Sequence, residues 1–284
     1  GVVIHAMSGI DIALWDIKGK ALNMPICKLL GGVQRDKVRA YGSTLMPYTP
    51  QEAAEEALRW KEQGFSAVKM GWGGFELPQS ECVKLVEATR NAIGDDMDMM
   101  LDIGFIPSGD FNVTAASRLL LINEIREFKP YWIEEAVYPD DYEGYKMLVE
   151  STDVRIAGGE NETTRYGFKQ LIEVCKLDIL QPDITRCGGL TEAKRIGAMA
   201  TAHNTTVIPH AWSSGIVIAA SLHFIATQSN SNLLEYCVWD TPIRKEMLKQ
   251  DFKLRDGYVD VPMGPGLGIE IDDEAIQKYR CDII

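Results

Sequence analysis

Seven polar side chains in this sequence each end a short apolar run, and their types suit metal-assisted proton chemistry. They are Lys69, Asp102, Glu134, Glu160, Asp183, His210 and Glu235. Consecutive members are roughly 30 residues apart, which is the length of one strand and helix unit. If the apolar runs are parallel strands of one barrel, their carboxyl ends bring these side chains to one mouth. The spacing therefore predicts a single site.

Three of these residues are carboxylates from successive strands: Asp102, Glu134 and Glu160. Three negative charges held together repel one another, and a divalent cation removes the conflict. A ligand set made only of oxygen favours Mg²⁺ over zinc. The alternative interpretation is that each carboxylate pairs with a lysine or arginine of its own. Because the three follow one another in register, we interpret them as a magnesium site.

His210 ends the run "VIPHAW", where a histidine is more often structural than catalytic. Asp183 ends the preceding run and could hydrogen-bond one ring nitrogen, which fixes the tautomer and makes the other nitrogen a general base. Such a base beside a metal suits removal of the proton alpha to a carboxylate. Lys69 could stabilise the resulting enediolate, and Glu235 could donate a hydrogen bond if neighbouring carboxylates keep it protonated. The other histidines are expected to be structural or exposed.

The elements that would position these residues alternate regularly. Eight apolar runs are separated by segments of helical period, which indicates a (β/α)8-type α/β barrel. The runs are 38–43, 67–72, 98–104, 131–136, 155–160, 178–184, 206–212 and 232–236. No glycine-rich nucleotide loop follows any of them, which disfavours an open doubly wound sheet.

We divide the chain into an N-terminal helical segment (1–36), a catalytic barrel (37–240) and a C-terminal tail (241–284) with a hairpin pattern. In the first segment, Ile10, Leu14 and Ile17 share one helical face and Ser8 is a possible cap. Asp11 and Asp16 on the same helix are expected to be solvated or to cap it.

Composition limits the possible partners. The 284 residues are 46% hydrophobic and carry a net charge of −12, which argues against binding to a phosphate backbone. No run is long and apolar enough for a membrane helix. Six scattered cysteines without a C-x-x-C pair indicate free thiols and a cytoplasmic protein. The expected partner is a small acid substrate, and we expect a homo-oligomer.

The sequence resembles the enolase superfamily, in its mandelate racemase subgroup. The resemblance rests on "GIDIALWDIKGKALNMPICKLLGG", "WIEEA", "GGEN", "QPDITRCGG", "IPHAW" and "GPGLGIEID". It implies a TIM-type (β/α)7β barrel whose N-terminal capping domain is missing from this chain, so that the tail would be left without its packing partner. It also implies that Asp102, Glu134 and Glu160 are the magnesium ligands, that Asp183 and His210 form the dyad, and that Glu235 is the glutamate of the last strand.

Two departures from the subgroup point to a reaction type. Racemases of the subgroup usually carry K-x-K on the second strand, whereas this chain has Lys69 and then Gly71. The third strand usually ends D-x-N, but Gly104 replaces the amide here. With one base, loss of the 3-hydroxyl is favoured over inversion at C2. We therefore expect a sugar-acid dehydratase, closest to rhamnonate dehydratases. The alternatives are a racemase or epimerase, and a truncated barrel that binds metal without catalysis.

Overall fold

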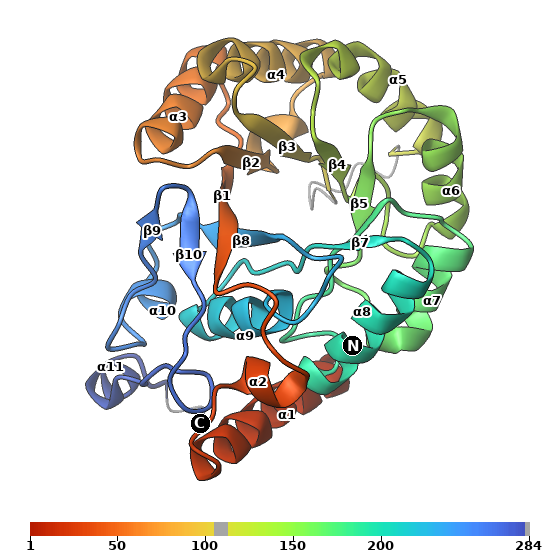
Figure 1. The fold of residues 1–284 in the computed structure, drawn as a ribbon. Coiled ribbons are helices and arrows are strands. Elements are labelled where there is room, and N and C mark those ends of the chain that lie inside the picture. Colours follow the sequence, from red (N-terminus) through yellow and green to blue (C-terminus); the bar gives the residue numbers. More distant parts are fainter. Residues whose placement is uncertain (105–112, 282–284) are drawn as a thin grey trace.

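A computed structural model describes residues 1–104 and 113–281. It contains eight parallel strands in the predicted positions, and helices follow them along the chain. The strands are β1 (Lys37–Leu45), β2 (Ala67–Gly71), β3 (Asp98–Asp102), β4 (Trp132–Glu134), β5 (Ile156–Gly158), β6 (Ile179–Leu180), β7 (Thr206–Val207) and β8 (Leu233–Cys237). Helices α3 to α8 form an arc outside the strands (Figure 1). The predicted mixed α/β class is confirmed.

Helices occupy the segments of helical period between the strands. They are α3 (Pro50–Glu62), α4 (Gln79–Ile93), α5 (Ala115–Ile125), α6 (Tyr142–Ser151), α7 (Thr164–Glu173), α8 (Gly189–Ala202) and α9 (Gly215–Ile225). Helix α3 illustrates why the sequence starts a helix where it does. The hydroxyl of Thr49 accepts a hydrogen bond from the amide of Glu52, and Pro50 occupies the first turn, where its missing N–H costs nothing.

Backbone pairing runs in the order β8, β1, β2, β3, β4, β5, β6 and β7, all parallel. In this register Asp102 is the partner of both Gly71 and Glu134. Among the described residues no ladder joins β7 to β8, so hydrogen-bonded closure of the barrel stays a prediction.

Side chains from the region of all eight strands meet in one buried cluster beneath the strand ends. Its members are Tyr41, Ala67, Met100, Trp132, Ala157, Ile179, Ile208 and Leu233. This layer supplies an apolar floor, and the polar residues at the carboxyl ends of the strands lie beyond it. The strand interiors are buried on both faces, as expected for a parallel sheet covered by helices.

Helix α1 (Val2–Ala21) corrects part of the sequence interpretation. Its apolar face is exposed: Ile10, Leu14 and Ile17 are each about 60% accessible. The polar side chains instead dock the helix, because Asp11 accepts hydrogen bonds from the amide and hydroxyl of Thr191 and Asp16 accepts one from the amide of Leu267.

Ser8 was expected to cap this helix, but it lies inside α1. Its hydroxyl donates to the carbonyl of Ile4 and accepts from the amide of Gly188, so that it joins α1 to the loop before α8. The short helix α2 (Ile26–Leu30) then leads into β1.

The C-terminal tail holds the predicted hairpin and returns to the first strand. Strands β9 (Leu254–Arg255) and β10 (Tyr258–Asp260) pair antiparallel, and β10 also pairs with β1. Two short helices, α10 (Pro242–Lys245) and α11 (Asp273–Lys278), flank the hairpin. In the part of the chain that the structure describes, none of the helices is both long and apolar enough to cross a membrane.

Candidate active site

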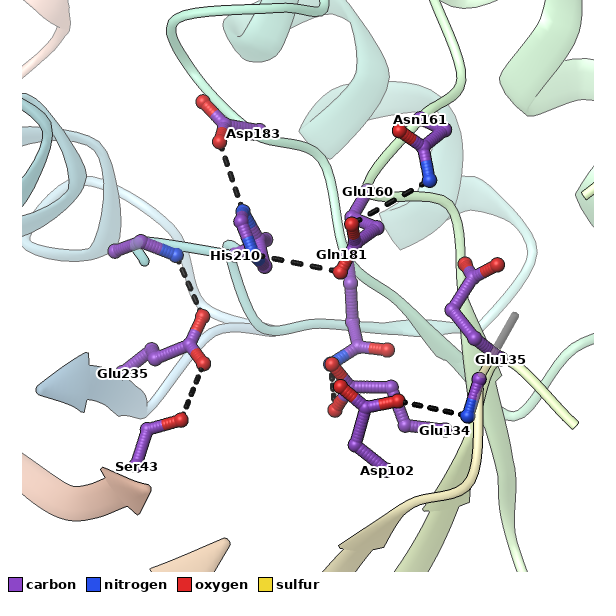
Figure 2. A network of polar contacts seen from close by, with 12 residues as sticks. Ser43, Asp102, Glu134, Glu135, Glu160, Asn161, Gln181, Asp183, His210 and Glu235 are labelled. Carbon is purple, nitrogen blue, oxygen red and sulfur yellow. Dashed lines mark hydrogen bonds and ion pairs between the residues drawn. The ribbon is translucent and has the colours of Figure 1, made fainter. Parts of the chain in front are cut away.

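The three predicted metal ligands lie together at the carboxyl ends of β3, β4 and β5. Asp102 and Glu134 end their strands, and Glu160 follows β5 by two residues. One carboxylate oxygen from each lies within 4.8 Å of the others, and all three side chains are buried (Figure 2). Burial and the charge of Glu134 raise the pKa of Asp102 well above its usual value. Three converging carboxylates repel one another, and a divalent cation bound between them would remove this repulsion.

Each carboxylate of the cluster is oriented by neighbouring donors. Glu134 accepts hydrogen bonds from Trp132 Nε1 at 2.9 Å and Gln181 Nε2 at 2.7 Å, and it also contacts Lys69. Asp102 accepts from the amide of Gly104 at 3.0 Å.

Two of the three carboxylates do have cationic neighbours, as the alternative interpretation required. Glu134 contacts Lys69, and Glu160 lies 3.3 Å from Arg186 Nη1. Asp102, however, has no ion pair among the described residues. The three carboxylates converge instead of separating into three ion pairs, and their oxygen-only donor set fits Mg²⁺.

The predicted dyad is formed. Asp183 Oδ2 lies 2.8 Å from His210 Nδ1, and His210 Nε2 faces Glu160 Oε2 at 3.3 Å (Figure 2). Burial alone would lower the pKa of His210, but the charges of Glu160 and Glu235 and the bond to Asp183 raise it to about 10. Burial opposes ionisation of Asp183, yet the hydrogen bond and charge of His210 lower its pKa. Without a metal, these shifts favour an ion pair in which the imidazolium of His210 carries a proton on each ring nitrogen. A cation held beside Glu160 would offset the charge of that carboxylate and favour the neutral imidazole that a general base requires.

Glu235 accepts three hydrogen bonds or ion pairs and donates none. Ser43 Oγ lies 2.8 Å from Oε1, Lys69 Nζ lies 2.8 Å from the same oxygen, and the amide of Ala211 lies 2.6 Å from Oε2. Burial favours the neutral acid, but Lys69 and His210 lower the pKa of Glu235 to about 2. The expectation of a protonated Glu235 is therefore wrong for this arrangement, because its partners are donors.

One cavity of about 130 Å³ is lined by Asp102 and Glu160 of the carboxylate cluster and by His210 of the dyad. Its lining also includes Lys69, Trp72 and Glu235. The cavity thus brings the predicted base, the predicted cation and a predicted metal ligand within reach of one small molecule.

Gly71 lines the same cavity, at the position where a second base would stand. A Cβ added there would lie 2.5 Å from the Cβ of Asp102, so a larger side chain does not fit this backbone. The close pairing of β2 with β3 therefore disfavours a second base at this position.

Glu135 does not join the cluster, although it is adjacent to Glu134. Its backbone has a positive φ of 48°, and its carboxylate accepts hydrogen bonds from the amide of Gly159 at 2.7 Å and the hydroxyl of Tyr145 at 3.1 Å. Burial and the charge of Glu160 raise the pKa of Glu135 to about 7.

Four residues near the site were not singled out from the sequence: Trp72, Trp132, Gln181 and Arg186. Trp132 and Gln181 could have been found from strand alternation, because each stands two residues before a predicted site residue and therefore shares its face. For Trp72 and Arg186, which lie in loops, the sequence offers no comparable signal.

Comparison with known proteins places this geometry in a family. Residues 52–275 match the model described as enolase C-terminal domain-like. The chain belongs to the enolase superfamily. Residues 2–31 match the model of the mandelate racemase and muconate lactonizing enzyme N-terminal domain, so α1 and α2 belong to that part of the family, and the predicted subgroup is confirmed.

Relatives in this superfamily carry names of sugar-acid enzymes. A D-galactarolactone cycloisomerase from Agrobacterium fabrum is 35% identical over 99% of this chain and 75% of its own length. A D-galactonate dehydratase from Cronobacter sakazakii is 36% identical over 97% of this chain and 73% of its own. The crystal structure of the 3,6-anhydro-D-galactonate cycloisomerase from Zobellia galactanivorans has a TM-score of 0.90 at 39% identity, covering 98% of this chain and 76% of that one.

Proposed function

We propose that this member of the enolase superfamily is a Mg²⁺-dependent dehydratase of a sugar acid. One observation carries the proposal: the cavity is lined by His210, whose ring is held by Asp183, and by Gly71, where an added Cβ would lie 2.5 Å from the Cβ of Asp102. Such a site can take a proton from one face of a carbon and has no second base for the opposite face. The dehydratase names among the relatives agree with this reading.

In the proposed reaction, Mg²⁺ held by Asp102, Glu134 and Glu160 would stabilise the negative charge that develops on the substrate carboxylate. Lys69 lies between Glu134 and Glu235 and would add a second positive charge beside the same oxygens. Both interactions strengthen as the carboxylate becomes an enediolate, which is what lowers the barrier.

His210 would move the proton. Its Nε2 accepts the proton from C2, while Asp183 holds Nδ1 and stabilises the imidazolium that forms. The C3–O bond then breaks, a C2=C3 double bond forms, and the departing oxygen takes the proton from His210 and leaves as water. The enol product tautomerises to a 2-keto-3-deoxy acid. Atoms and charges balance without another reactant.

A second candidate is supported by the relatives named cycloisomerases. In a 3,6-anhydro acid the oxygen on C3 belongs to a ring ether, and the same proton abstraction would open the ring instead of releasing water. The product is again a 2-keto-3-deoxy acid, now an isomer of the substrate. The two candidates therefore share every residue of the site and differ in the leaving group.

Neither remaining alternative is favoured by the site. A racemase or epimerase needs a base on the Gly71 side, where no side chain fits. A metal-binding barrel without catalysis would not require His210, held by Asp183, to line the same cavity as Asp102 and Glu160. We retain a cytoplasmic location and a homo-oligomeric state as predictions.

The test is incubation of the protein with Mg²⁺ and, separately, D-galactonate, D-xylonate and 3,6-anhydro-D-galactonate. We expect a semicarbazide-reactive keto acid from at least one of them. Mass spectrometry then assigns the leaving group: a dehydratase product is lighter than its substrate by one water, whereas a cycloisomerase product has the same mass. Inversion at C2 without keto acid would overturn both candidates.

A further inference from the structure

The GWGG turn (residues 71–74) follows β2 and holds its tryptophan in an unusual backbone conformation. Trp72 has φ 55° and ψ −147°, where residues with a Cβ are rarely found. Strain of this kind persists only when the surrounding structure imposes it, and it is concentrated at functional sites.

The flanking glycines show how the conformation is imposed. A Cβ on Gly71 would collide with Asp102, and a Cβ on Gly73 or Gly74 would collide with the backbone carbonyls that follow β1. The turn is therefore pressed between the ends of β1 and β3. A side chain at any of these three glycines would require the turn that carries Trp72 to shift.

The indole of Trp72 reaches from this turn to the metal cluster. Its Nε1 donates to Asp102 Oδ2 at 3.1 Å, and the backbone amide of Trp72 donates to the carbonyl of Asp102 at 3.0 Å. The side chain is 40% exposed and lines both the reaction cavity and an adjoining cavity of about 450 Å³. A large apolar group is thus kept at the mouth despite a strained backbone.

Asp102 differs from the other two carboxylates in how it is held. Glu134 and Glu160 have cationic partners, whereas the side chain of Asp102 is oriented by two neutral donors, the Gly104 amide on Oδ1 and the Trp72 indole on Oδ2. A neutral donor that binds one oxygen fixes a ligand without competing for the charge that a cation needs.

We propose that Trp72 is a positioning residue, whose indole N–H orients Asp102 for binding of the divalent cation. The inference rests on the magnesium site of the proposed function and adds a residue that the ligand set does not include. The three glycines of the turn contribute to this role, because only residues without a Cβ allow the backbone conformation that places the indole beside Asp102.

The test uses Mg²⁺ alone, so that it needs no substrate. Wild type, Trp72→Phe and Trp60→Phe are titrated with Mg²⁺ by calorimetry and by tryptophan fluorescence, after circular dichroism has confirmed their fold. Trp60 is the matched control, because its indole also donates to a carboxylate, Glu56 at 2.8 Å, but on helix α3 away from the cluster.

Trp72→Phe keeps the aromatic ring and removes the N–H. We expect it to weaken Mg²⁺ binding about tenfold and to reduce the fluorescence change that Mg²⁺ causes. Trp60→Phe should keep both the affinity and the fluorescence change. Equal affinity in wild type and Trp72→Phe would overturn this inference alone, whereas a wild type that binds no Mg²⁺ would overturn the metal site as well.

If Trp72→Phe does not fold, the wild type still decides the question. The indole N–H resonance of Trp72 should shift on addition of Mg²⁺, since its acceptor becomes a ligand. An unchanged resonance under saturating Mg²⁺ would overturn the proposal.

Discussion

Asp183 Oδ2 lies 2.8 Å from Nδ1 of His210, in a place where both side chains are buried. This bond fixes which imidazole nitrogen faces the cavity. Asp183→Asn keeps the size of the side chain but removes the charge that stabilises the imidazolium. We expect kcat to fall about 100-fold. Mg²⁺ affinity, measured by calorimetry, should stay close to that of wild type, because Asp183 is not part of the carboxylate cluster. A variant with unchanged kcat would contradict the role assigned to Asp183.

Two buried histidines, His210 and His223, should titrate far apart in the metal-free protein. The pKa of His210 is raised to about 10 by carboxylates, whereas burial lowers that of His223 to about 4. NMR titration of the ring carbons should therefore show His210 protonated and His223 neutral at pH 7. Adding Mg²⁺ should lower the pKa of His210, because a cation on Glu160 offsets that carboxylate's charge. If the pKa of His210 does not change on addition of Mg²⁺, then Mg²⁺ does not bind beside His210 and Glu160, which would contradict the account.

The same shift predicts a pH dependence of stability. Because the pKa of His210 is higher in the folded protein than its ordinary value of 6.5, its contribution to the free energy of unfolding is complete below pH 6.5. That contribution is lost as the pH rises through about 10. In urea unfolding without metal, the difference between wild type and His210→Asn should therefore shrink from pH 6 to pH 10. A difference that grows with pH would have the wrong sign.

Glu160 bridges the carboxylate cluster and the dyad. Glu160→Gln removes one ligand charge and should weaken Mg²⁺ binding by about an order of magnitude or more, without unfolding the protein. Glu173→Gln, on the exposed face of α7, is the matched control and should bind Mg²⁺ as wild type does. Equal affinities in the two variants would remove Glu160 from the metal site.

We expect any substitution that adds a side chain at Gly71 to destabilise the protein. In Gly71→Ala the new methyl group meets Asp102, and we expect the free energy of unfolding to fall by about 1–3 kcal/mol. Gly9→Ala is the control, because it lies within helix α1 with open space around it and should raise stability by about 0.5–1 kcal/mol. Urea unfolding compares the two. A neutral Gly71→Ala would mean that β2 and β3 can separate to admit a second base.

The strands and most site residues could be predicted from the sequence, for a physical reason. A buried parallel strand reads as a short apolar run, and the first polar residue after it marks the strand end. Asp102, Glu134 and His210 were found this way, and their convergence follows from the repeated connection between strands.

Other features depend on contacts that no local pattern encodes. The spacing of apolar residues in α1 predicts a helix but not which of its faces packs against the protein. The polar face does, through the hydrogen bond that Asp11 accepts from Thr191. The partners of Glu235 come from three separate segments of the chain, at Ser43, Lys69 and Ala211. The positive φ of Trp72 is imposed by packing of its turn, so its role near Asp102 emerged only from the structure.

The central claim is that His210 takes the proton from C2 and that C3 then loses its oxygen. The most direct measurement is NMR of wild type and His210→Asn in heavy water with Mg²⁺ and each of the three acids named above. The account predicts that wild type forms a 2-keto-3-deoxy acid from at least one of them. It also predicts that His210→Asn forms none and exchanges no C2 proton, although it still binds Mg²⁺. Exchange or keto acid formation that survives in His210→Asn would contradict the account.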